Sequence, residues 1–115
     1  MVSEIRLGSA GERFPIADPS LQPRLLPRPD SDADYLKAML EGIAAIEALG
    51  YQRLAELGAP KLTSVRSVGG GAANAAWTEI RRRRLGVDFL PALSDEAAAG
   101  TARLALTGAR EAGLP

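Results

Sequence analysis

The fold is decided by the stretch Val65-Arg66-Ser67-Val68-Gly69-Gly70-Gly71-Ala72-Ala73-Asn74-Ala75-Ala76-Trp77. Its apolar start predicts a strand, its three glycines predict a turn, and Asn74 is suited to cap the helix that follows. Glycine has no side chain and takes backbone angles closed to other residues, so the turn can bring backbone against a flat or anionic group. The helix adds amide hydrogens and the positive end of its dipole. Two interpretations stay open: a turn that binds a ligand, and a tight turn in which glycine serves geometry alone.

The composition of the 115-residue chain allows one domain and excludes several classes of function. Lys and Arg total 14 against 14 Asp and Glu, so no net charge favours nucleic acid or an anionic membrane. The absence of cysteine and histidine removes disulfides, thiolate nucleophiles and the usual zinc ligands. No apolar run has the length of a membrane span, and the N-terminus lacks a basic segment followed by an apolar one. We therefore expect a cytoplasmic chain with no nucleic-acid or membrane partner.

Residues 1–30 form the first of two expected regions, a proline-rich irregular segment. Its prolines exclude a continuous helix or a central strand. A segment of this length without regular structure seldom stands alone in a compact domain. We therefore expect it to pack against another part of the protein, as the tail of a preceding region. The five prolines are Pro15, Pro19, Pro23, Pro27 and Pro29.

The second region, residues 31–115, begins with a long helix. Ser31 offers a hydroxyl cap with acidic residues in the first turn, and Gly58 ends the helix. Gly42 and Gly50 lower its stability unless a neighbour packs closely there. Its apolar residues recur at three- and four-residue steps and predict a core-facing stripe of Leu36, Met39, Leu40, Ile43, Ile46, Leu54 and Leu57.

The rest of the chain predicts two short strands, 61–68 and 87–90, on either side of a helix at 75–85 that Gly86 ends. A strand, a helix and a second strand predict two parallel neighbours. Ser94 is expected to cap a last helix, with Asp95 and Glu96 in its first turn. The class is thus α/β, but two strands make a poor free-standing sheet, and their exposed edges can favour a homo-oligomer.

Four consecutive arginines, Arg81 to Arg84, close the middle helix. They point around it at steps of about 100°, so they cannot form one stripe, and they suit the negative end of the helix dipole. We expect a solvated helix end; the alternative is a phosphate or nucleic-acid patch.

Two common nucleotide motifs are absent from the glycine turn. A P-loop needs a lysine and a hydroxyl residue after its glycines, where this chain has Ala72-Ala73-Asn74. The dinucleotide fingerprint needs a third glycine at the position of Asn74. What remains is a glycine platform beside an amide side chain, suited to holding a planar base or a ribose.

Four motifs in order resemble the C-terminal domain of the FGGY carbohydrate kinases, the group that holds xylulokinase, ribulokinase and glycerol kinase. They are G-E-R-F-P-I-A-D-P, Y-L-K-A-M-L-E-G-I-A, V-G-G-G-A-A-N-A-A-W and S-D-E-A-A-A-G-T-A, within about residues 11–108. The resemblance implies part of a ribonuclease H-like, actin/sugar-kinase ATPase fold, with ATP in a cleft between two domains.

The resemblance also implies which residues bind the nucleotide. Gly70, Gly71 and Ala72 would contact adenosine, Asn74 would lie near the purine or ribose, and Gly100 would pack close to the turn. The reaction of the family transfers the γ-phosphoryl group of ATP to a sugar hydroxyl, with Mg²⁺ and a carboxylate base.

No catalytic or metal-binding residue is assigned, because the family's catalytic aspartate and most of its sugar contacts lie upstream of these motifs. None of Asp18, Asp30, Asp32 and Asp34 matches that aspartate. We expect the C-terminal, adenosine-binding segment of a ketose or polyol kinase, inactive by itself. The alternatives are a stand-alone, non-catalytic nucleotide-binding or interaction module, and a small helical structural protein with an incidental glycine turn.

Overall fold

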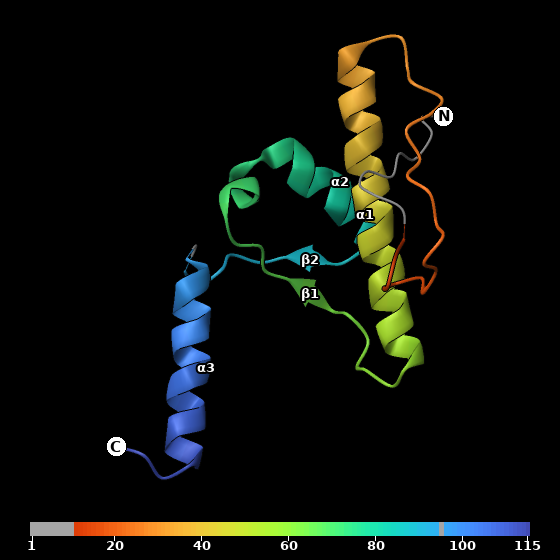
Figure 1. The fold of residues 1–115 in the computed structure, drawn as a ribbon. Coiled ribbons are helices and arrows are strands. Elements are labelled where there is room, and N and C mark those ends of the chain that lie inside the picture. The colour runs from red at the N-terminus through yellow and green to blue at the C-terminus, as the bar shows by residue number, and fades with distance from the viewer. Residues whose placement is uncertain (1–10, 95) are drawn as a thin grey trace.

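The computed structural model describes residues 11–94 and 96–115, which form an α/β arrangement (Figure 1). The strands β1 and β2 pair in parallel, with Ser64 opposite Asp88 and Val65 opposite Phe89. The predicted parallel pair is confirmed, although both strands are shorter than expected. In chain order the elements are α1 (Asp32–Glu56), β1 (Ser64–Val65), the 3₁₀ turn η1 (Gly70–Ala73), α2 (Ala75–Leu85), β2 (Asp88–Phe89) and α3 (Ala97–Glu111).

Local capping explains where α1 and α2 begin and end. The Ser31 hydroxyl accepts a hydrogen bond from the Asp34 N–H at 3.1 Å, as the sequence predicts. The Asn74 side-chain oxygen accepts one from the Trp77 N–H at 2.9 Å and starts α2. Gly86, with φ +66°, ends α2 in the left-handed conformation that a side chain disfavours.

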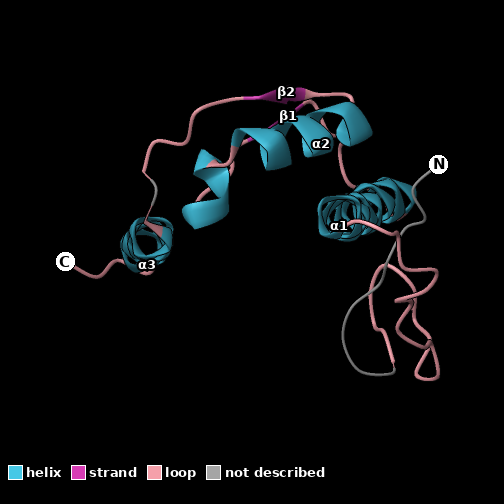
Figure 2. Cartoon of the chain, turned by 90° about the horizontal axis from the view of Figure 1, so that it is seen from above, coloured by secondary structure: helices cyan, strands magenta, loops and turns pink. Residues whose placement is uncertain are grey.

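Helix α3 begins later than predicted, and the expected Ser94 cap is wrong. Its N-cap residue is Glu96, whose side chain makes no capping hydrogen bond. The Ser94 hydroxyl instead accepts the N–H of Glu96 at 3.2 Å, a local turn that precedes the helix. Asp95, also expected in the first turn, lies outside the described residues. In the described part of the chain α3 contacts neither the other helices nor the strands, and it projects away from them (Figures 1 and 2).

The small core is formed by buried residues of α1, β1 and α2. Its buried apolar residues within the described ranges are Ala38, Ala44, Val65 and Ile80. Helix α1 therefore contributes small residues to the core, and the expected burial of its larger apolar stripe is wrong in part: the exposed fraction of Leu36 is 54% and that of Leu57 is 79%. The reason is length, because an 11-residue α2 and a two-stranded sheet cover only part of a 25-residue helix.

The proline-rich segment, residues 11–30, runs beside α1 without helices (Figure 1). The ring of Phe14 lies so close to Gly50 that a Cβ there would be 3.2 Å from the Phe14 Cε1 atom. Close packing is thus the reason that α1 tolerates Gly50. The described residues include no helix that is both long and apolar enough to cross a membrane.

Gly86 and Gly108 have similar surroundings, so substitutions at these two positions test whether the backbone conformation of Gly86 ends α2. A Cβ at either Gly86 or Gly108 would meet no atom within 4 Å, but only Gly86 has a positive φ. We expect Gly86→Ala to lower the free energy of unfolding by about 1 kcal/mol, because alanine disfavours that conformation. Gly108→Ala, inside α3, should instead raise helical content. Circular dichroism during urea unfolding measures both, and equal effects would contradict the assignment of the α2 end.

Candidate functional site

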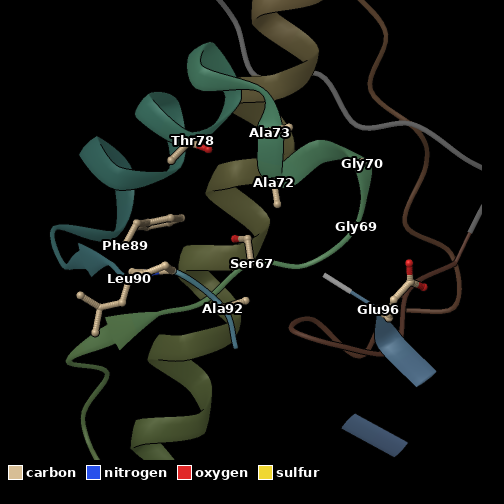
Figure 3. Close-up of a pocket in the computed structure, with 11 residues that line it drawn as sticks. Ser67, Gly69, Gly70, Ala72, Ala73, Thr78, Phe89, Leu90, Ala92 and Glu96 are labelled. Carbon is tan, nitrogen blue, oxygen red and sulfur yellow. The ribbon is translucent and has the colours of Figure 1, made fainter. Parts of the chain in front are cut away.

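A cavity of about 870 Å³ lies at the edge of the sheet where both strands end (Figure 3). The carboxyl ends of parallel strands meet at one edge, and ligands of α/β proteins bind outside that edge. The volume is within the usual range for small-molecule sites. The lining residues are Ser67, Gly69, Gly70, Ala72, Ala73, Thr78, Phe89, Leu90, Pro91, Ala92 and Glu96.

One wall of the cavity is the backbone of the glycine turn. Gly69 has φ +90°, a conformation that requires glycine. The turn is closed by the Ala72 N–H, which donates to the Gly69 carbonyl at 3.1 Å. A Cβ at Gly70 would meet nothing within 4 Å, so this wall has open space in front of it that side chains would otherwise fill.

The opposite wall is the end of β2 and the residues that follow it. Phe89 supplies an aromatic ring, and Leu90 and Pro91 supply apolar surface. The Leu90 N–H donates to the Val65 carbonyl at 2.8 Å, which extends the pairing of the strands into this wall. The Arg66 Nε donates to the Pro91 carbonyl at 3.2 Å and holds the chain beyond the strand.

The polar groups of the cavity are two hydroxyls and one carboxylate. They belong to Ser67, Thr78 and Glu96, and Figure 3 shows Glu96 at the start of α3, apart from Phe89 and Leu90. Among the described residues that line the cavity, none is Lys or Arg. Such a lining suits a neutral ligand with hydroxyl or amino groups better than it suits a phosphate, which the carboxylate would repel.

Arg81 lies beside this cavity and joins several elements. Its Nε and Nη2 donate to the two carboxylate oxygens of Glu47 on α1, at 2.8 and 2.7 Å. Its Nη1 donates to the Ser67 hydroxyl. The guanidinium carbon lies 5.5 Å from the centre of the Trp77 ring and 5.0 Å from that of Phe89. The hydrogen bonds with Glu47 raise the pKa of Arg81.

The expectation of a solvated arginine cluster is therefore wrong for Arg81. Its side chain is 13% exposed, because Glu47 pairs with it across the contact of α1 and α2. The expectation holds for Arg82 and Arg83, which are exposed and pair with Glu79 on their own helix.

The structure brings together only some of the predicted nucleotide-binding residues. Gly70 and Ala72 line the cavity. Gly71 does not line it: a Cβ there would lie 3.5 Å from the Trp77 ring. The Asn74 oxygen is used in the cap of α2. Gly100 lines a neighbouring cavity of about 410 Å³. A Cβ added at Gly100 would meet no atom within 4 Å, so Gly100 does not pack against the turn as expected.

Sequence reasoning did not find Ser67, Thr78, Phe89 or Glu96 as candidate site residues. For Ser67 and Phe89 a signal was present, because both lie at or just after a predicted parallel strand, where α/β ligand sites occur. For Glu96 there was none, since its position depends on how the chain turns after β2.

Within the described residues, the acidic side chains form no candidate metal site, and Asp18 is poorly suited to act as a base. The described part of the chain holds no group of three or more His, Cys, Asp or Glu side chains that could bind a metal ion. The N–H and hydroxyl of Ser20 hydrogen-bond to Asp18 and lower its pKa. A carboxylate with a lowered pKa is a weak base.

One comparison identifies the class of protein that has this sequence pattern. Residues 7–109 match the model of the FGGY family of carbohydrate kinases, C-terminal domain. The matched range contains both strands, the glycine turn and helices α1 and α2, and so the whole cavity.

Asn74 can be tested for its structural role apart from any ligand. We expect Asn74→Ala to lower the free energy of unfolding by about 1 kcal/mol, because α2 loses its cap. Asn74→Asp keeps a capping oxygen, so its free energy of unfolding should be close to that of the original chain. Urea unfolding followed by circular dichroism measures both. Equal stability of the two variants would show that the hydrogen bond to the Trp77 N–H does not stabilise α2.

Proposed function

The chain belongs to the FGGY family of carbohydrate kinases, and from this we propose that its cavity binds the adenosine part of ATP. In this proposal the chain is the C-terminal, nucleotide-side segment of a kinase that phosphorylates a ketose or polyol, of the xylulokinase or ribulokinase kind. The observation that carries the proposal is the pairing of a bare glycine backbone with the aromatic wall of Phe89 around one cavity.

The chemistry of the lining supports adenosine as the bound part of the nucleotide. A purine is flat and can lie between the glycine backbone and apolar side chains, as Gly70 and Phe89 allow. The carboxylate of Glu96 can accept hydrogen bonds from ribose hydroxyls, the role that acidic residues have in many dinucleotide sites. Asn74 keeps an amide nitrogen that its cap does not use, but Asn74 is not among the residues that line the cavity, so the proposal assigns it no contact with the base.

The phosphates are placed outside the cavity in this proposal. They would be repelled by Glu96 and would meet no Lys or Arg in the described lining. Mg²⁺, which the family uses with ATP, would neutralise charge on the γ-phosphoryl group that is transferred to a sugar hydroxyl, and no described residue of this chain is assigned to hold it. The residues of this chain contribute binding and orientation of the nucleoside, and no described residue is assigned to take the hydroxyl proton.

A stand-alone interaction module is the second candidate, and the apolar surface of α3 favours it. Leu104 is 76% exposed and Leu106 is 51% exposed on a helix that contacts no other element of the described chain. The two leucines are two residues apart and do not share a face of the helix, so the support comes from the lack of a neighbouring element and not from one continuous apolar patch. The two candidates differ in nucleotide binding: the adenosine site requires it, and the interaction module does not.

Titration of the purified chain with ADP, followed by amide NMR shifts, tests the adenosine site. We expect shifts in residues 69–77 and 89–96. Gly70→Val should weaken ADP binding about tenfold or more, which is roughly 1.4 kcal/mol, because its side chain fills the cavity. Gly108→Val, far from the cavity, is the control. Unchanged affinity in Gly70→Val, or shifts elsewhere only, would remove the glycine turn from the site.

Catalysis is tested separately. We expect the chain by itself to release no ADP from ATP with xylulose, ribulose or glycerol as acceptor, because none of its residues matches the catalytic aspartate of the family. A coupled assay for ADP measures this, with an active kinase of the family as the positive control. Sugar-dependent turnover by the chain would contradict the assignment of a binding role alone.

A further inference from the structure

We propose that Arg81 is a positioning residue that sets the conformation of the glycine turn by tying Ser67 to helix α1. Ser67 lies two residues before Gly69, at the entry to the turn, and it also lines the cavity. Arg81 itself does not line the cavity, so it would act through Ser67. The inference rests on the proposed function, because it assigns a residue outside the cavity to the shape of the adenosine wall.

The geometry of the guanidinium group supports this role. Two of its nitrogens donate hydrogen bonds to the two carboxylate oxygens of Glu47. These two bonds fix the plane of the guanidinium relative to α1. The third nitrogen then points in a fixed direction, and there it donates to the Ser67 hydroxyl. A lysine has a single nitrogen on a flexible stem and cannot reproduce this fixed fork.

The two rings beside the guanidinium connect it to both walls of the cavity. Phe89 belongs to the wall opposite the glycine turn, and Figure 3 shows it across from Ser67 and the turn. Trp77 lies next to the turn, where a Cβ on Gly71 would be 3.5 Å from its ring. A displaced guanidinium would therefore disturb the turn through Trp77 and the aromatic wall through Phe89.

Ser67→Ala and Arg81→Met separate this role from general packing. Arg81→Met removes both the ion pair with Glu47 and the bond to Ser67, and it leaves a partly buried carboxylate without its partner. Ser67→Ala removes only the bond to the turn and leaves the ion pair between α1 and α2. Ser67→Thr restores the hydroxyl. Arg82→Met is the matched control, since Arg82 pairs with Glu79 on its own exposed face.

The first measurement needs no ligand. Order parameters from ¹⁵N relaxation report how rigid the amides of residues 70–73 are. We expect values of about 0.85 in the original chain, Ser67→Thr and Arg82→Met, and values below about 0.6 in Ser67→Ala and Arg81→Met. Unchanged values in Ser67→Ala would overturn the proposal. So would an equal loss of order in α1 and α2, because that would be a packing effect and not a local one.

The second measurement is ADP affinity, followed by the fluorescence of Trp77, the single tryptophan of the chain. We expect about tenfold weaker binding in Arg81→Met, partial recovery in Arg81→Lys and no change in Arg82→Met. A mobile turn with unchanged affinity would overturn the link between Arg81 and the ligand. No ADP binding by the original chain would instead refute the proposed function, while the relaxation data would still decide whether Arg81 holds the turn.

Discussion

The ion pair of Arg81 and Glu47 is the interaction on which the rest of the described structure depends. It joins α2 to α1 at a point where the Arg81 side chain is 13% exposed and that of Glu47 is 22% exposed. Charges that lose water in this way require a partner with good geometry, and the two-point contact with Glu47 supplies it. Since β1 precedes α2 in the chain and β2 follows it, the pair also orients the sheet edge and the cavity.

The apolar contacts around this pair are few. The buried apolar side chains of the described residues belong to two alanines, one valine and one isoleucine, whereas many large apolar residues remain exposed. The radius of gyration is 17.4 Å, against about 13 Å for a compact domain of 100 residues, because α3 projects from the other elements (Figure 1). A polar contact therefore has more influence on the arrangement of α1 and α2 here than it would within a large core.

The sequence predicts those parts of the structure that depend on neighbouring residues. Ser31, Asn74 and Gly86 were identifiable because a cap is a bond between residues two to four apart, or the conformation of one residue. The parallel pair followed from element order. The contact of Arg81 with Glu47 was not predictable, because it joins residues 34 positions apart, and four equivalent arginines gave no sign of which one faces α1. The cavity and the place of Gly100 depend on the same long-range geometry.

The composition of the cavity limits how the proposed nucleotide could be recognised there. A P-loop holds phosphates by charge and by amide hydrogens, whereas this turn has no lysine and lines a cavity that also contains the carboxylate of Glu96. Under the proposed function, recognition would come from shape, from stacking on Phe89 and from hydrogen bonds to the nucleoside, including those that Glu96 accepts from the ribose. Such contacts depend on the spacing of the two walls, and their strength depends little on salt, since surface charges are not the source of attraction. In the proposed function, the rigidity of the glycine turn, more than the charge of the site, would then determine how well adenosine binds.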